Sequence, residues 1–164
     1  MLKLKEKINI FWFRRDLRLE DNAGLYHALK GDLPVLPIFI FDKNILDQLE
    51  EKADRRVEFI HAALEEIQAD LVAMGSSLSV VYGTPLTVFK QLLSKHTIDT
   101  VFANHAYERY ARERELTIAK LMKESSACFQ TYKDQVVLEK SEVLKDDGTP
   151  YTVFTPYSRK WKAV

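Results

Sequence analysis

Short apolar runs alternate with longer amphipathic stretches along most of the chain, and this alternation limits the possible folds more than any other feature. The apolar runs, rich in β-branched and aromatic residues, are 8–13, 35–41, 78–82, 100–104 and 127–132. Parallel strands need long crossover connections, which are usually helical and right-handed. The pattern therefore predicts a doubly wound α/β domain, in which helices cover both faces of a five-stranded parallel sheet.

The stretches between the runs carry helix signals. Apolar residues recur at spacings of three and four in 54–74, where they form the stripe Val57, Ile60, Leu64, Ile67, Leu71 and Met74, and Gly75 ends this helix. In the next helix Thr84 is the expected N-cap and Pro85 the first helical residue. Its expected core face is Leu86, Phe89, Leu92 and Leu93.

Two further segments complete the secondary-structure prediction. A short helix is expected at 23–30, and another at 109–123 with Leu116, Ala119 and Met122 on its apolar side. The rhythm changes after Lys133. A turn cluster occupies 146–150, and 151–161 is expected to be irregular or extended.

The composition favours one ordinary globular domain. The chain has 164 residues, and its 24 Lys and Arg balance its 24 Asp and Glu, so it lacks the net positive charge typical of non-specific nucleic-acid binding. Cys128 is the single cysteine, which excludes an internal disulfide and fits the cytoplasm. The N-terminus shows no secretory signal, and the longest apolar run, 34–41, is too short to span a bilayer.

Two loops are the best candidates for a binding site, because ligands of such sheets bind at the carboxyl ends of the strands. The loop after the first strand, 14–22, contains no glycine, which disfavours a dinucleotide fingerprint and a P-loop. Its arginines Arg14, Arg15 and Arg18 could clamp a phosphate or carboxylate. Alternatively, Asp16 could pair with one or two of them and hold the loop.

The loop after the fourth strand carries polar groups suited to a flat heterocycle. Asn104 and Glu108 could bind the donor edge of such a ring, and Tyr107 could stack on it. His105 could be a base or a solvated loop histidine. The other histidines have no metal-ligand spacing. By its residues alone the chain has a polar pocket and no evident catalytic machinery.

The segment 12–22, with the letters WFRRDLRLEDN, resembles the N-terminal signature of the DNA photolyase and cryptochrome family. Further similarities follow in family order at 39–42, 55–64, 104–108 with Arg112 and Arg114, and 148–157. Together with the strand and helix alternation, the resemblance predicts a Rossmann-like sheet with strand order 3-2-1-4-5. It further implies that residues 1–133 form the N-terminal α/β domain and that 134–164 begin the interdomain linker.

The resemblance implies a division of labour in a larger parent protein. The α/β domain supports the protein and can hold a light-harvesting pigment. A helical domain, which we expect to be absent from this chain, holds FAD and binds ultraviolet-damaged DNA. The leading function is the light-harvesting or scaffold domain of a deoxyribodipyrimidine photolyase, a light-driven lyase, and the chain alone is expected to be inactive. The alternatives are a cryptochrome-type photoreceptor domain and a stand-alone nucleotide-binding module.

The resemblance also implies where a pigment would bind. Folate-binding members use a polar pair at positions that align with Tyr110 and Ala111 here. Members with a deazaflavin or flavin pigment place it nearer the strand ends, and there Ala106 occupies the position of an expected acidic partner. The expected cofactor-binding residues are Arg15, Phe39, Phe41, Asn104 and Glu108. In members without a second pigment, equivalent residues serve as core and interface.

Overall fold

A computed structural model describes residues 6–51 and 53–164, and its centre is a single parallel sheet. The strands are β1 (Lys7–Phe13), β2 (Val35–Asp42), β3 (Ser79–Gly83), β4 (Thr97–Asn104) and β5 (Cys128–Tyr132). Their order is β3-β2-β1-β4-β5, and every neighbouring pair is parallel. The predicted fold class and strand order are therefore confirmed.

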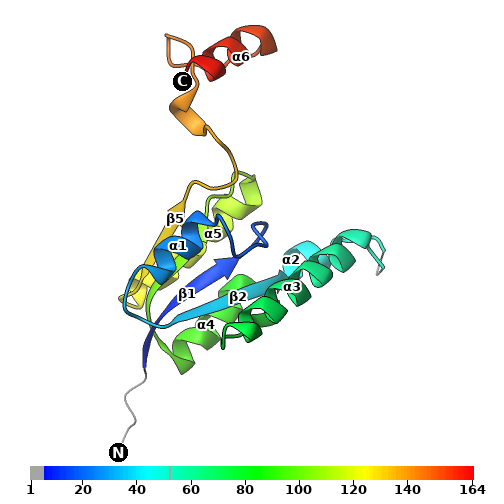
Figure 1. Cartoon of the computed structure of the whole chain (residues 1–164), viewed down its shortest axis with the longest axis vertical. Coiled ribbons are helices and arrows are strands. Elements are labelled where there is room, and N and C mark those ends of the chain that lie inside the picture. The colour runs from blue at the N-terminus through cyan, green and yellow to red at the C-terminus, as the bar shows by residue number, and fades with distance from the viewer. Residues whose placement is uncertain (1–5, 52) are drawn as a thin grey trace, which may run out of the picture.

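Helices cover both faces of this sheet (Figure 1). α1 (Ala23–Leu29) and α3 (Arg55–Ala73) pack on one face, whereas α4 (Pro85–Lys95) and α5 (Arg109–Glu124) pack on the other. β1 contributes side chains to the cores on both faces of the sheet, because successive side chains of a strand point to opposite faces. Phe11 and Phe13 lie in the core with α1 and α3, and Ile10 and Trp12 lie in the core with α4 and α5.

Pro37 lies inside β2, an interior strand, where a missing N–H would normally interrupt the ladder. It is paired with Phe11 of β1, but the pairing of β2 with β3 starts only at Ile38 and Ser79. The absent N–H of Pro37 therefore removes no hydrogen bond to β3.

Local sequence signals set the beginnings of the helices. The Asn22 side chain accepts a hydrogen bond from the Leu25 N–H at the start of α1. Thr84 caps α4 by accepting from the Thr87 N–H, and Pro85 is the first helical residue, as predicted. Gly75 follows α3 with a φ of 79°, in the left-handed region that favours glycine, so its predicted role at the helix end is confirmed.

The predicted helix faces need three corrections. α3 ends at Ala73, so Met74 lies beyond its stripe and is 66% exposed. In α4 Val88 is buried, whereas Leu86 is 37% exposed. In α5 Leu116 is 72% exposed, and the buried residues are Ala111, Ile118 and Met122. At 3.6 residues per turn these three lie on one line, and Leu116 points to the opposite side.

The C-terminal segment also differs from the prediction. After the short 3-10 helix η1 (Lys140–Glu142), residues Phe154–Ala163 form helix α6, where irregular or extended chain was expected. The expectation was wrong because Pro156 falls in the first turn, where the backbone N–H has no intrahelical partner and its loss is harmless.

Figure 1 shows α6 standing clear of the sheet, at the end of the segment that follows β5. No residue of α6 is buried, and Phe154 is 77% exposed. A separate α2 (Lys43–Leu46) is one turn at the end of β2. In the part of the chain that the structure describes, no helix has the length and apolar character needed to cross a membrane.

Candidate functional site

A cavity of about 310 Å³ lies at the carboxyl ends of β1 and β2, and we call it the β2 cavity. Apolar side chains from β2, α2, α3 and the loop between the two helices form much of its wall, among them Phe39, Phe41, Ile45, Leu46, Leu49, Val57 and Ile60. The rings of Phe39 and Phe41 meet edge to face at 5.0 Å. The cavity therefore offers a largely apolar surface of the kind that flat ring systems occupy.

Buried charges border the same cavity, next to Trp12. The guanidinium groups of Arg14 and Arg114 lie 5.3 and 5.0 Å from the centre of the Trp12 ring, within cation–π distance. Arg14 pairs with Glu115, and Arg114 donates to Asp42 at 3.1 Å. The cavity thus combines an aromatic wall with two almost fully buried cations.

These cations are incompletely satisfied. Burial lowers the pKa of Arg14, and the hydrogen bond and charge of Glu115 oppose this effect. Arg14 Nη2 and Arg114 Nε are buried without a hydrogen-bond partner among the described residues. Unpaired buried donors are uncommon in folded proteins, and they mark this as a region where a group with acceptor atoms would be stabilised.

A second cavity, of about 350 Å³, lies between the loops after β1 and β4, and we call it the loop cavity. Its lining comes from both loops and from the segment after β5: Arg14, Arg15, Asp16, Arg18, Asn104, His105, Ala106, Asp134 and Gln135. Arg14 and Arg15 line both cavities. The predicted place of the site, at the divergence of these two loops, is therefore hollow in the structure.

Asn104 uses its amide to hold the first loop. Its Nδ2 donates to Asp16 Oδ2 at 2.5 Å and to Asn22 Oδ1 at 2.8 Å, and its Oδ1 accepts from the Gly24 N–H at 2.7 Å. The residue is 4% exposed. The expected contact of this amide with a heterocycle would have to compete with these hydrogen bonds, so its visible role is to position the loop.

Each arginine of the first loop has a separate acidic partner. Arg14 pairs with Glu115, Arg15 with Glu108 at 2.5 Å, and Arg18 with Asp134 at 2.9 Å. Asp16 accepts hydrogen bonds from the Arg14 backbone N–H and from Asn104. Asp16 therefore helps to hold the loop, as one interpretation proposed, but through a backbone group and an amide.

His105 and Tyr107 converge on Glu139, a residue of the segment after β5. His105 Nδ1 lies 2.8 and 2.9 Å from the two carboxylate oxygens, and the Tyr107 hydroxyl donates to Glu139 Oε2 at 2.5 Å. Burial raises the pKa of Glu139, but the hydrogen bonds from His105 and Tyr107 outweigh it and lower that pKa to about 2. Burial and the bond to Glu139 raise the pKa of Tyr107 to about 12. His105 is thus tied to a carboxylate, and no base function follows from its surroundings.

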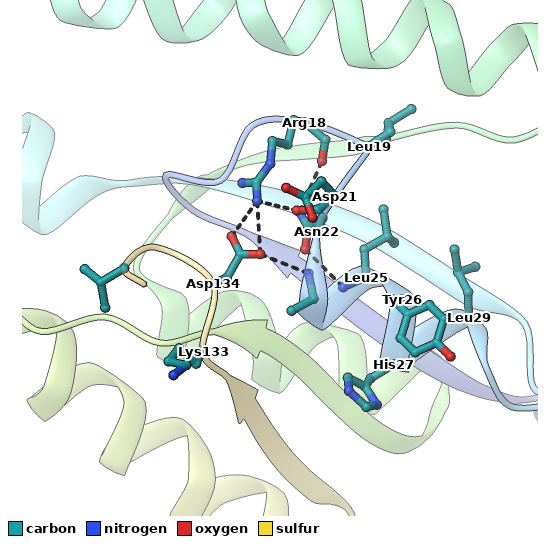
Figure 2. A pocket seen from close by; sticks show the side chains of 12 residues that line it. Arg18, Leu19, Asp21, Asn22, Leu25, Tyr26, His27, Leu29, Lys133 and Asp134 are labelled. Atoms are coloured by element: carbon teal, nitrogen blue, oxygen red, sulfur yellow. Dashed lines mark hydrogen bonds and ion pairs between the residues drawn. The ribbon is translucent and has the colours of Figure 1, made fainter. Parts of the chain in front are cut away.

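A third hollow, of about 620 Å³, is open and lies beside α1 (Figure 2). Figure 2 shows Asp134 facing the Arg18 guanidinium, and Tyr26, His27 and Leu29 on α1 at the other end. The His27 ring stacks on Tyr132 with the ring centres 3.9 Å apart. No metal-binding group of three histidine, cysteine or acidic side chains occurs in the described ranges.

The structure brings four of the five predicted binding residues onto the two cavities. Phe39 and Phe41 line the β2 cavity, Asn104 lines the loop cavity, and Arg15 lines both. Glu108 joins this group through its ion pair with Arg15. These contacts place the residues together, and their binding role stays a prediction.

Sequence reasoning missed the buried partners of the site. Beside the β2 cavity, the buried arginines contact Trp12, Asp42 and Glu115. Around the loop cavity, the two loops are bound by Asp134, which pairs with Arg18, and by Glu139, which accepts from Tyr107. One signal was present, because Trp12 and Asp42 lie at the carboxyl ends of β1 and β2. Glu115, Asp134 and Glu139 carried no local signal, since each lies on another element or loop.

Comparison with known proteins identifies the family. The DNA photolyase family model matches residues 9–164. An uncharacterized 31.6 kDa protein of Synechococcus sp. PCC 6716 is 33% identical over 96% of this chain and 55% of its own length. A deoxyribodipyrimidine photo-lyase of Synechococcus sp. PCC 6301 is 32% identical over 94% of this chain and 32% of its own length.

A solved structure agrees with these matches. The archaeal photolyase from Sulfolobus tokodaii superposes with a TM-score of 0.83 at 31% identity, over 95% of this chain and 35% of that chain. The present chain therefore spans about half of one relative and about a third of the other two. These matches decide against an unrelated nucleotide-binding module of similar architecture. The chain belongs to the DNA photolyase family, and its α/β fold and strand order are those of the N-terminal domain of photolyases.

Proposed function

We propose that this chain is the light-harvesting α/β domain of a deoxyribodipyrimidine photo-lyase and that its β2 cavity holds the pigment. The observation that carries this proposal is the combination, in one cavity at the carboxyl edge of the sheet, of aromatic walls and buried arginines with unpaired donors. A pigment bound there would absorb light and pass the excitation to the FAD of the parent enzyme.

The size of the β2 cavity supports a ring-sized occupant. Its 310 Å³ is at the lower end of the range of about 300–1,000 Å³ for small-molecule sites. That space suits a single fused ring system better than a whole dinucleotide. Phe39 and Phe41 would contact the ring face or edge, and Arg15, whose side chain is 65% exposed, would meet an anionic tail leading toward the loop cavity.

A flavin-type or deazaflavin pigment fits better than a folate. The position that aligns with the polar pair of folate-binding relatives holds Tyr110, whose hydroxyl donates to Asp42 at 2.7 Å and accepts from Asn44 at 3.0 Å. Its hydrogen-bonding capacity is thus used within the protein. The Sulfolobus tokodaii photolyase structure contains two FAD molecules and was taken to imply a novel light-harvesting cofactor.

Fluorescence titration tests the pigment site. Flavin mononucleotide, a deazaflavin and a folate are each added to the chain, to its Arg15→Ala and Phe41→Ala variants and to an Arg109→Ala control. Arg109 is a matched control because its side chain is 93% exposed and paired on α5 with Glu113. Loss of one charge-assisted contact costs about 1.5–3 kcal/mol when buried, so the exposed Arg15 should give roughly a three- to tenfold loss of affinity. Binding that neither site variant weakens beyond the control would place the pigment elsewhere.

The repair activity belongs to this proposal as well. We expect two partners, a FAD-binding domain of the same protein and, through that domain, damaged DNA. We expect the protein to act in the cytoplasm and not to bind a membrane. Because the chain spans about a third of the photolyase relatives, we expect it not to repair dimers when assayed alone. Illumination of thymine-dimer DNA with the isolated chain and with the full-length parent tests whether the parent repairs dimers and whether the chain alone does not. Absence of repair by the parent would favour a cryptochrome-type photoreceptor.

A further inference from the structure

The guanidinium groups around the loop cavity keep most of their donors unused. Arg14, Arg15 and Arg18 line this cavity, and a guanidinium group carries five N–H donors. Among the described residues, the Arg14 side chain donates only through Nη1 and Arg18 only through Nη2, and Arg15 meets its acidic partner through Nη1. Arg14 Nη2 is buried without a partner, on a side chain that is only 8% exposed. The cavity wall therefore carries donors that lack an acceptor within the described part of the protein.

The two carboxylates that line the same cavity are already occupied. Asp16 accepts hydrogen bonds from the Arg14 backbone N–H and from Asn104. Asp134 accepts from Arg18 Nη2 at 3.0 and 2.9 Å and from the backbone N–H of the first residue of α1 at 3.0 Å, and Figure 2 shows Asp134 facing Arg18. Both carboxylates therefore hold the loop in place, and the unused guanidinium donors remain available to an acceptor from outside the protein.

One arginine and one amide can adapt to such an acceptor at little cost. The ion pair of Arg15 with Glu108 has side chains that are 65% and 44% exposed, and exposed ion pairs contribute little to stability. Gln135 lines the cavity from the segment after β5, is exposed, and its side-chain amide has no hydrogen-bond partner among residues 6–51 and 53–164. Planar guanidinium forks match the oxygens of a phosphate group especially well.

We propose that the loop cavity is a phosphate subsite, which binds the phosphate monoester at the end of the pigment's side chain. This inference rests on the proposed pigment site in the β2 cavity. Arg14 and Arg15 line both cavities, so the two spaces adjoin and a side chain can lead from the ring to the phosphate. The volume of about 350 Å³ accommodates a phosphate with a short chain. The substrate class is therefore a phosphorylated flavin-type ring, and the same ring without phosphate binds more weakly.

A pair of flavins that differ only in the phosphate tests this subsite. Flavin mononucleotide and riboflavin are titrated by fluorescence into the chain and into its Gln135→Glu variant. This substitution places a negative charge on the wall of the loop cavity and leaves the β2 cavity unchanged, because Gln135 lines only the former of the two. Gln91→Glu is the matched control, since Gln91 is exposed on α4 and lines neither cavity.

We expect flavin mononucleotide to bind roughly ten- to a hundredfold more tightly than riboflavin, the effect of charge-assisted hydrogen bonds to the phosphate. Gln135→Glu should reduce this advantage at least severalfold without changing the affinity for riboflavin, and Gln91→Glu should change neither affinity. Equal affinities for the two flavins, or an advantage that Gln135→Glu leaves intact, would overturn the phosphate subsite. Binding of the ring would in that case still support the pigment site.

Inorganic phosphate separates this subsite from the pigment site. At constant ionic strength, phosphate should raise the melting temperature of the chain and of Gln91→Glu, because a ligand of the folded state stabilises it, and should raise that of Gln135→Glu much less. Phosphate should also compete with flavin mononucleotide and not with riboflavin. If neither flavin binds but phosphate gives this selective rise, the proposed pigment function fails and free phosphate is the ligand of the subsite. An equal rise in Gln135→Glu, or no rise in any of the proteins, would refute the subsite itself.

Discussion

Gly24 is the position where a single added methyl group should destabilise the domain most clearly. A Cβ at this position would lie 2.7 Å from Asn104 Oδ1, 2.9 Å from Phe11 Cε2 and 3.1 Å from the backbone carbon of Ala103. The first of these atoms accepts the hydrogen bond of the Gly24 N–H, the second belongs to a fully buried ring, and the third is part of β4. None of them can move aside without disturbing the sheet or the loop that carries the arginines.

The size of the effect can be worked from these contacts. Overpacking costs about 1–3 kcal/mol, and loss of the buried hydrogen bond to Asn104 adds about 1–3 kcal/mol. Alanine is better than glycine inside a helix by about 1 kcal/mol, which offsets part of the loss. We expect Gly24→Ala to lower the free energy of unfolding by about 2–4 kcal/mol and to shift the urea midpoint by ~1–2 M.

The matched control is Gly31→Ala, measured in the same urea titration by circular dichroism. Nothing lies within 4 Å of a Cβ at Gly31, so this change should leave the stability unchanged or raise it by about 0.4–1 kcal/mol. If the two variants unfolded at the same urea concentration, the close packing of α1 on β4 would not be the reason for glycine at position 24.

Three further predictions concern stability. Hydrogen bonds lower the pKa of Glu139 to about 2, so its carboxylate stabilises the fold fully above the ordinary pKa of 4.5, and this contribution is lost as the pH falls toward 2. Glu139→Gln should therefore reduce the loss of stability at acid pH in a plot of unfolding free energy against pH. An unchanged acid dependence would contradict the assignment. Phe89→Ala should cost about 3–5 kcal/mol in chemical denaturation, whereas Phe59→Ala, at a position 75% exposed, should cost less than about 0.5 kcal/mol. Asp42→Asn should cost about 3–5 kcal/mol by leaving Arg114 as a buried charge without its partner, and a melting temperature close to wild type would refute that view of the pair.

Local and periodic features of the chain were readable from sequence. The five strands, the alternation with helices and the cap at Thr84 depend on neighbours within a few residues, and all of them appear in the structure. The strand order was also correct, because the family signature at 12–22 supplied what the alternation alone does not specify. The predictions of which helix faces are buried were less accurate, as the exposed Leu116 shows. A short run of apolar residues does not reveal which side of a helix packs on a sheet.

The amino-acid sequence by itself determined the α/β alternation, the boundaries of α1, α3 and α5 to within a few residues and the two loops that meet at the carboxyl edge of the sheet, but not the helical conformation of α6. The tertiary structure alone decided which charges meet there. Arg14 is 101 positions from Glu115 and Arg18 is 116 positions from Asp134, and no local pattern selects such partners. The physical reason is that backbone hydrogen bonds and side-chain periodicity act over a few residues, whereas an ion pair between loops forms only after the sheet has brought their ends together.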